Sequence, residues 1–329
     1  AMASPTASSE TQPMRFALIG AGAMGANYVR AVQSLTDVRI TAVVDAQVER
    51  AHQMCAVIGA RAAASLAHAG DVDAVIVAVP SADHRAVAEP LLARGLHCLV
   101  EKPFALTEED CRALIAAAAR GNARLQVGHV ERFNAAMQVL LARNIAVADI
   151  STLTARRMNV GSARVMDIDV VLDLMVHDID AVMAVKKSPV TDVSATGTKD
   201  HAVAVLTFAD GTTAHVTASR VTEGRTRDLT VEMRDGAVYA LDYIERTLTR
   251  DGAPLPVAGD ANNLGRQMTS FARAIRSGSA TEVSGEDALA VMDAAQLDSM
   301  EHMHSKGHDG ADSSSVTLPI FEVSHVLHC

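Results

Sequence analysis

Apolar and polar residues alternate along this chain in two distinct patterns, and the first pattern extends to about residue 130. Short apolar runs of strand length alternate there with longer segments of helical periodicity. This order predicts a parallel sheet whose strands are joined by right-handed helical crossovers. We expect strands at 16–20, 39–44, 73–79, 97–100 and 124–128, and helices at 23–34, 47–58, 84–94 and 107–120.

The second pattern begins after residue 145, where Asp-Gly pairs stand beside segments of alternating hydrophobicity. These pairs are Asp210-Gly211, Asp235-Gly236 and Asp251-Gly252. Asp-Gly favours tight turns between antiparallel strands. The second half is therefore predicted to be an α+β domain with an open, mainly antiparallel sheet. Helices at about 131–143, 168–186, 263–277 and 285–305 are expected to cover it.

A glycine motif follows the first predicted strand directly. It reads Gly20-Ala-Gly22-Ala23-Met24-Gly25, and a helical segment comes after it. In such a strand–turn–helix the first glycine permits the tight turn, the second lets the backbone approach a pyrophosphate, and the third allows close helix packing. The phosphates then meet the helix N-terminus. This context predicts a doubly wound, dinucleotide-binding Rossmann domain in preference to an ordinary glycine turn.

Other residues in the first half are candidates for cofactor contacts. Asp45 ends the second predicted strand, where its carboxylate can accept hydrogen bonds from the adenosine ribose and repel a 2′-phosphate. No arginine follows it directly, so NAD is favoured over NADP. Pro80, Ser81 and His84 follow the third strand and are candidates for the nicotinamide side. Helix capping is the commoner use of a serine at such a position.

A charged pair, Glu101-Lys102, follows the fourth predicted strand and precedes Pro103. The carboxyl ends of strands in a doubly wound sheet face the ligand crevice. Lys102 can there lie beside the nicotinamide and donate a hydrogen bond to a substrate oxygen. A surface lysine at a strand end explains the spacing equally well. Pro103 is expected to fix the turn, and a cis bond before it is one way to do so.

A mainly apolar helical segment at 170–183 carries one polar stripe. Asp173, His177 and Asp180 recur at spacings that place them on one helix face. Polar groups in a buried helix are costly unless they are paired or used. Histidine exchanges protons near neutral pH, and Asp173 can orient it. The alternative is a solvated stripe on an amphipathic helix.

A polar cluster lies where the two patterns meet. His129, Arg132 and Asn134 follow the last parallel strand, and directed donors of this kind suit a ligand rich in oxygen. Arg157 is added to this predicted substrate-binding set. A cluster that caps and packs a helix start is the alternative.

Composition and charge narrow the class of protein. The net charge of −10 argues against a nucleic-acid partner. Four cysteines without paired spacing favour a reducing compartment, the cytoplasm, and no apolar run approaches membrane-spanning length. We predict no metal: His302, His304 and His308 lack cysteine neighbours and are interpreted as a surface cluster.

These motifs together resemble the Gfo/Idh/MocA oxidoreductases, the family of glucose–fructose oxidoreductase and inositol dehydrogenase. The glycine motif, Asp45, Glu101-Lys102-Pro103 and Asp173-x-x-x-His177 occur in the family's order over residues 14–319. The resemblance implies that Lys102, Asp173 and His177 are catalytic, and that Glu101 and Lys102 also contact the cofactor.

Two further segments resemble a subgroup of that family. They are Gly128 to Asn134 and Asp167 to Asp180, and they look like members that oxidise nucleotide-linked amino sugars, such as UDP-N-acetylglucosamine 3-dehydrogenases. Asp169 departs from the small residue expected there. The domains implied are a disordered tail at 1–13, a dinucleotide-binding domain at 14–130, a substrate and oligomerisation domain at 131–319, and a tail at 320–329.

The sequence thus predicts an NAD-dependent sugar dehydrogenase that acts on a small-molecule sugar and forms a homodimer or homotetramer. Three alternatives stay open. The first is a dehydrogenase of free inositol or aldose, the second is an NADP-dependent reductase working in reverse, and the third is an NAD-sensing regulator without turnover.

Overall fold

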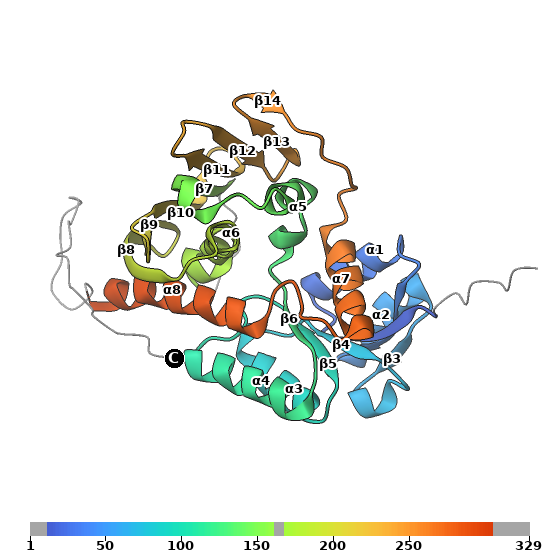
Figure 1. The fold of residues 1–329 in the computed structure, drawn as a ribbon. Helices are drawn as coiled ribbons and strands as arrows, with labels where there is room; N and C mark the ends of the chain where they lie inside the picture. Colours follow the sequence, from blue (N-terminus) through green and yellow to red (C-terminus); the bar gives the residue numbers. More distant parts are fainter. Residues whose placement is uncertain (1–11, 161–167, 305–329) are drawn as a thin grey trace, which may run out of the picture. The chain divides into compact units, whose positions relative to one another are not determined.

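The structure, a computed structural model, describes residues 12–160 and 168–304, with side chains through 295. The described chain forms two compact units (Figure 1). The first contains the chain up to Gly128 together with Asn262–Glu286, and the second contains His129–Ala261 with the chain from Asp287 onward. Within these residues no helix is long and apolar enough to cross a membrane.

The first unit is built on a six-stranded parallel sheet with the order β3-β2-β1-β4-β5-β6. Its strands are β1 Met14–Ile19, β2 Val38–Val44, β3 Arg61–Ala63, β4 Ala74–Val77, β5 His97–Val100 and β6 Leu125–Val127. Its helices are α1 Ala23–Val32, α2 Val48–Ile58, α3 His84–Ala93, α4 Glu108–Gly121 and α7 Asn263–Ser277. The strand order reverses between β1 and β4, the point at which doubly wound sheets bind ligands at their carboxyl ends. The predicted Rossmann architecture is confirmed.

Local sequence accounts for much of this unit. The hydroxyl of Thr107 accepts a hydrogen bond from the Asp110 amide and caps α4, which carries three acidic residues in its first turn. The apolar strand residues Phe16 and Leu18 are fully buried, as strands covered on both faces must be.

Helix α7 returns to the first unit from far along the chain. Figure 1 shows it in orange beside α1. Its residues Met268, Phe271 and Ala272 belong to the core of the first unit, and the rings of Phe271 and Phe16 lie 6.1 Å apart between centroids. The sequence predicted a contiguous second domain from 131 to 319, and α7, which lies within that range, belongs to the first unit instead. Helical periodicity revealed an apolar face in this segment but not which core that face would join.

The second unit holds an eight-stranded sheet with the order β14-β13-β12-β11-β7-β10-β9-β8. Its strands are β7 Ile150–Val160, β8 Val190–Thr198, β9 His201–Phe208, β10 Thr213–Thr222, β11 Thr226–Met233, β12 Val238–Asp242, β13 Thr247–Arg250 and β14 Ala253–Pro254. β7 and β10 pair in parallel and every other neighbouring pair is antiparallel. The prediction of a mainly antiparallel sheet is confirmed.

The predicted Asp-Gly turns lie in the loops after β9, β11 and β13. Their glycines all have positive φ: Gly211 at +80°, Gly236 at +89° and Gly252 at +79°. Strand β9 alternates buried and half-buried residues along its length, so one face of the sheet carries the core. Helices α5 Ala135–Ala142, α6 Val176–Lys186 and α8 Gly285–His304 complete this unit.

Some expectations concern residues that the structure does not describe. They are the tail up to residue 11, the tail at 320–329, Asp167 and His308, together with the side chains of His302 and His304.

Candidate active site

The glycine motif forms the turn between β1 and α1, and two of its glycines are required by close backbone contacts. Gly20 has a φ of +108°, and a Cβ there would collide with the carbonyl of Ala78. A Cβ on Gly25 would collide with the carbonyl oxygen of Gly20. Gly22 is different, because a Cβ there would meet no atom within 4 Å. The turn is therefore closely packed at Gly20 and Gly25, whereas the space beside Gly22 is open.

That open position fits a pyrophosphate. Gly22 is the N-cap of α1, and no side chain caps this helix end. The first amides of a helix have no partner within it, so those of Ala23 and Met24 are available to phosphate oxygens. The chain's own residues therefore fit the phosphates of a dinucleotide.

Asp45 lies beside the same turn at the carboxyl end of β2. Its Oδ2 accepts a hydrogen bond from the Ala21 amide at 2.8 Å, and its Oδ1 accepts one from the Gln47 amide at 2.8 Å. The carboxylate is thereby fixed next to the glycine turn, and each oxygen keeps a second lone pair for a ribose hydroxyl.

The predicted cofactor residues after β4 differ in how far they are exposed. Pro80 is exposed and Ser81 is half-buried at the start of a short 3-10 turn, Ser81–Asp83, without a side-chain cap. His84 is 1% exposed, and its Nδ1 and Nε2 lie 3.2 and 3.1 Å from the carbonyl oxygens of Phe104 and Val79. Burial lowers the pKa of His84. The ring of His84 thus lies between two backbone segments, and its expected cofactor contact stays a prediction.

Glu101 and Lys102 follow β5 at the carboxyl edge of the sheet, and the bond from Lys102 to Pro103 is cis. Lys102 is half-buried, whereas Glu101 is 6% exposed. The Tyr28 hydroxyl donates a hydrogen bond of 2.5 Å to Oε1 of Glu101. Burial raises the pKa of Glu101 to about 7.

In the second unit, Asp173 and His177 lie at the start of a buried helix. Asp173 belongs to a π-helical turn, Val171–Met175, and His177 is in the first turn of α6. The sequence predicted an uninterrupted α-helix here, and the wider turn is a correction. Such turns occur frequently at functional sites. Asp169, the residue that departs from the subgroup pattern, accepts a hydrogen bond from the Leu172 amide through Oδ1 and fixes the start of this turn.

An arginine that sequence analysis did not single out holds Asp173. Arg220, on β10, reaches Oδ2 of Asp173 through Nη1 at 3.4 Å. Its guanidinium also donates to the carbonyl oxygens of Ile168 and Lys199. No motif signals this role, since the two partners are 47 residues apart.

Three members of the predicted substrate set have structural partners. Arg132 makes two hydrogen bonds of 2.8 Å to Asp180, which is fully buried. Asn134 is the N-cap of α5 and accepts from the Ala136 amide. Arg157 is 1% exposed and buried among carboxylates. Each of these side chains has a partner within the second unit, and its assignment to substrate contacts stays a prediction. The fourth member, His129, is 2% exposed.

The partners of Arg157 form a buried ionic cluster. Asp178 receives two hydrogen bonds of 2.9 Å from it, and Glu131 receives one of 2.9 Å. Its guanidinium also lies over the ring of Tyr243, 5.6 Å from the centroid. Burial lowers the pKa of Arg157, but the two carboxylates outweigh burial and raise it overall.

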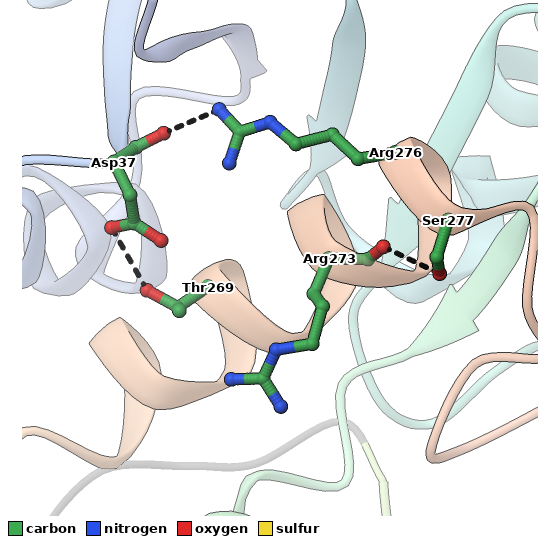
Figure 2. Close-up of a pocket in the computed structure, with 5 residues that line it drawn as sticks. All are labelled: Asp37, Thr269, Arg273, Arg276 and Ser277. Carbon is green, nitrogen blue, oxygen red and sulfur yellow. Dashed lines mark hydrogen bonds between the residues drawn. The ribbon is translucent and has the colours of Figure 1, made fainter. Parts of the chain in front are cut away.

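A hollow of about 460 Å³ lies elsewhere on the first unit, along α7 (Figure 2). Figure 2 shows Arg276 reaching the backbone oxygen of Asp37, and the hydroxyl of Thr269 bonded to the Asp37 carboxylate. None of the predicted site residues lines this hollow. Among the described residues, no group of three or more histidines, cysteines or acids could hold a metal ion.

Comparison with known proteins identifies the family. A model described as "Oxidoreductase family, NAD-binding Rossmann fold" matches residues 14–129, and the GFO/IDH/MocA C-terminal domain matches residues 164–239. UDP-N-acetylglucosamine 3-dehydrogenase from Acidithiobacillus ferrooxidans is 34% identical over 71% of this chain and 76% of its own length. The chain belongs to the Gfo/Idh/MocA family. It is an NAD-binding oxidoreductase, as the sequence predicted.

Two further comparisons place the chain within this family. Inositol 2-dehydrogenase from Rhizobium meliloti is 27% identical over 85% of this chain and 94% of that protein. The solved structure of the A. ferrooxidans UDP-N-acetylglucosamine 3-dehydrogenase has a TM-score of 0.82 at 29% identity, covering 88% of this chain and 98% of that one. Sugar and cyclitol dehydrogenases are thus its relatives.

Proposed function

We propose that this chain oxidises a hydroxyl-bearing carbon of a nucleotide-linked amino sugar, with UDP-N-acetylglucosamine as the first candidate. The observation that carries the proposal is the similarity to the A. ferrooxidans 3-dehydrogenase, which extends over most of both chains in sequence and in structure. The first unit binds NAD and the second binds the sugar.

The proposed roles follow from residue chemistry. NAD, when bound, supplies the hydride acceptor. His177 takes the proton of the substrate hydroxyl as general base. Lys102 donates a hydrogen bond to the same oxygen and stabilises negative charge on it. Asp173 orients His177 or hydrogen-bonds the sugar, and Arg220 supports the position of Asp173.

The proposed cofactor contacts come from the first unit. Their support is the open space above Gly22, the fixed carboxylate of Asp45 and the partial exposure of the turn that follows β4. The residues assigned to NAD are Gly20, Gly22, Ala23, Met24, Gly25, Asp45, Pro80, Ser81, Glu101 and Lys102.

Turnover tests the proposal directly. The purified chain with NAD is assayed for NADH formation on UDP-N-acetylglucosamine, other UDP-sugars and free myo-inositol. Oxidation of a UDP-sugar is expected, and Lys102→Ala is expected to lower kcat at least about a hundredfold while NAD still binds. Near-normal turnover by Lys102→Ala would remove this lysine from the mechanism.

A second candidate is a free cyclitol, because the R. meliloti inositol 2-dehydrogenase matches a larger share of this chain at lower identity. The same assay separates the two. Turnover of myo-inositol without turnover of any UDP-sugar would favour the cyclitol.

Assembly and location are part of the same proposal. A homodimer or homotetramer is favoured because β8 and alternate residues of β9 are not buried within the single chain. The cysteines Cys55, Cys98 and Cys111 are buried, and cysteines without paired spacing suit the reducing cytoplasm. Light scattering during size-exclusion chromatography will measure the subunit number.

A further inference from the structure

A buried polar network in the first unit connects α1, α7 and the end of β5. Gln267 donates through Nε2 to the Tyr28 hydroxyl at 2.7 Å, and Tyr28 donates to Oε1 of Glu101 at 2.5 Å. Tyr28 and Gln267 are 0% exposed and Glu101 is 6% exposed. Three polar side chains, from α1, from α7 and from the residue after β5, thus meet in the interior. The last of them, Glu101, directly precedes Lys102 in the sequence.

The carboxyl group of Glu101 is held on two further sides. A Cβ added to Gly128, just after β6, would lie 2.9 Å from three atoms of that carboxyl group. Its Oε2 lies 3.2 Å from the amide nitrogen of Lys102, which donates to it. The carboxyl group is therefore packed against β6 and bonded to the backbone of the lysine turn.

Burying this polar network costs more free energy than a purely apolar contact would. Burying a carboxylate is unfavourable, and apolar side chains of similar size would fill the same space without that penalty. Oε1 of Gln267 is buried with no hydrogen-bond partner in the described chain, as is Oε1 of Gln126 on β6. Packing alone does not explain why a carboxylate lies here.

We propose that Tyr28 and Gln267 are positioning residues that fix Glu101 beside the lysine turn, and that the Glu101 carboxylate in turn strengthens the hold of Lys102 on its ammonium proton. The inference rests on the proposed role of Lys102. Through Tyr28, helix α1 would then influence the protonation of Lys102. The N-terminus of the same helix is the proposed position of the pyrophosphate.

The surroundings of Glu101 define the direction of this effect. Within the part of the chain that the structure describes, the charged or titratable groups facing Glu101 are Tyr28 on α1 and the adjacent Lys102. The uncharged Gln267 on α7 and Gly128 just after β6 lie on the other sides. Burial raises the pKa of Glu101, and Tyr28 and Lys102 each oppose burial. Charge coupling is mutual, so an ionised Glu101 must also favour the protonated amine of Lys102.

Removal of the phenol hydroxyl is the first test. Tyr28→Phe leaves the ring but removes the donor, so Glu101 will ionise only at higher pH. We expect kcat near pH 7 to fall about tenfold and to recover by about pH 9. Glu101→Gln is expected to lose a similar factor without recovery, and Tyr239→Phe in the second unit serves as the matched control. A Tyr28→Phe profile that superimposes on the wild type, or a loss that is equal at every pH, would overturn the inference.

A second measurement needs no substrate. Competitive acetylation of Lys102 across pH, read by peptide mass spectrometry on the full chain, gives the proton affinity of its amine. Glu101→Gln is expected to raise the acid dissociation constant of Lys102 about tenfold. An unchanged constant would refute the coupling even in an active enzyme. A different outcome separates the two proposals. If the wild type oxidises no sugar but Glu101→Gln still raises the dissociation constant of Lys102, the proposed function is refuted and the coupling between Glu101 and Lys102 is supported.

Discussion

Nη1 of Arg220 lies 3.4 Å from Oδ2 of Asp173, and Nη2 of the same guanidinium lies 2.7 Å from Oδ1 of Asp200. One arginine on β10 therefore connects the π-helical turn before α6 with the turn between β8 and β9. The amide of Val170, which donates to the carbonyl oxygen of Lys199 at 2.9 Å, makes a second link between the same two turns.

Arg220→Ala is expected to lower kcat about tenfold, because Asp173 loses the cation that fixes it. Arg220→Lys should recover only part of this, since an ammonium cannot reproduce a planar fork of donors. NAD affinity, measured by calorimetry, should stay unchanged because its site is in the first unit. Arg234→Ala, which removes an exposed arginine of the second unit, is the control. Equal kcat for Arg220→Ala and the wild type would contradict the role assigned to Arg220.

Arg157 and its neighbour Arg156 offer a matched pair for measuring burial. Arg157→Leu leaves Asp178 buried without its partner and is expected to lower the free energy of unfolding by about 3–5 kcal/mol. Arg156→Leu breaks an exposed ion pair with Asp228 and should change it by less than about 1 kcal/mol. Urea unfolding of both variants measures the difference. Equal losses would show that burial does not decide the importance of these ion pairs.

Gly22 separates cofactor binding from folding. A side chain at this position meets no protein atom, so Gly22→Asp should leave the melting temperature unchanged. Its carboxylate would occupy the phosphate position, and we expect NAD to bind at least about tenfold more weakly. Gly25→Ala should instead lower the melting temperature, because its methyl group meets the carbonyl of Gly20. Unaltered NAD affinity in Gly22→Asp would place the pyrophosphate elsewhere.

Glu101 gives a pH dependence of stability. Burial raises its pKa from the ordinary value of 4.5 to about 7 in the folded chain. Between these values the folded chain binds a proton that the unfolded chain does not, so the contribution of Glu101 to the free energy of unfolding falls as pH rises. The full decrease is about 3 kcal/mol.

Glu101→Gln removes this dependence. The stability of the variant relative to the wild type should therefore increase from about pH 5 to about pH 8, as measured by urea unfolding at both pH values. Other titrating groups cancel in this comparison. A constant difference would mean that Glu101 titrates at its ordinary pKa in the folded chain.

The sequence predicted the features that depend on neighbouring residues. The glycine turn is such a feature, because Gly25 is constrained by the backbone of Gly20 in the same turn. Asn134 is another, since an asparagine before the apolar run of α5 is a recognisable N-cap, although substrate binding was preferred for it.

The contacts that the sequence did not predict depend on distant partners. Arg132 and Asp180 are 48 residues apart, and Tyr28 and Gln267 are 239 apart. An arginine with a buried carboxylate looks the same in a sequence as an arginine with a ligand. The π-helical turn at Asp173 also leaves no trace in the apolar periodicity, because one wider turn does not change which residues are apolar.

The return of α7 to the first unit has a consequence for biosynthesis. All strands of the second sheet have been synthesised before Phe271 is available to cover Phe16. During synthesis the first unit therefore has part of its core uncovered until the sheet of the second unit has been translated. A gene fragment that stops near codon 130 would encode a lobe lacking this covering helix.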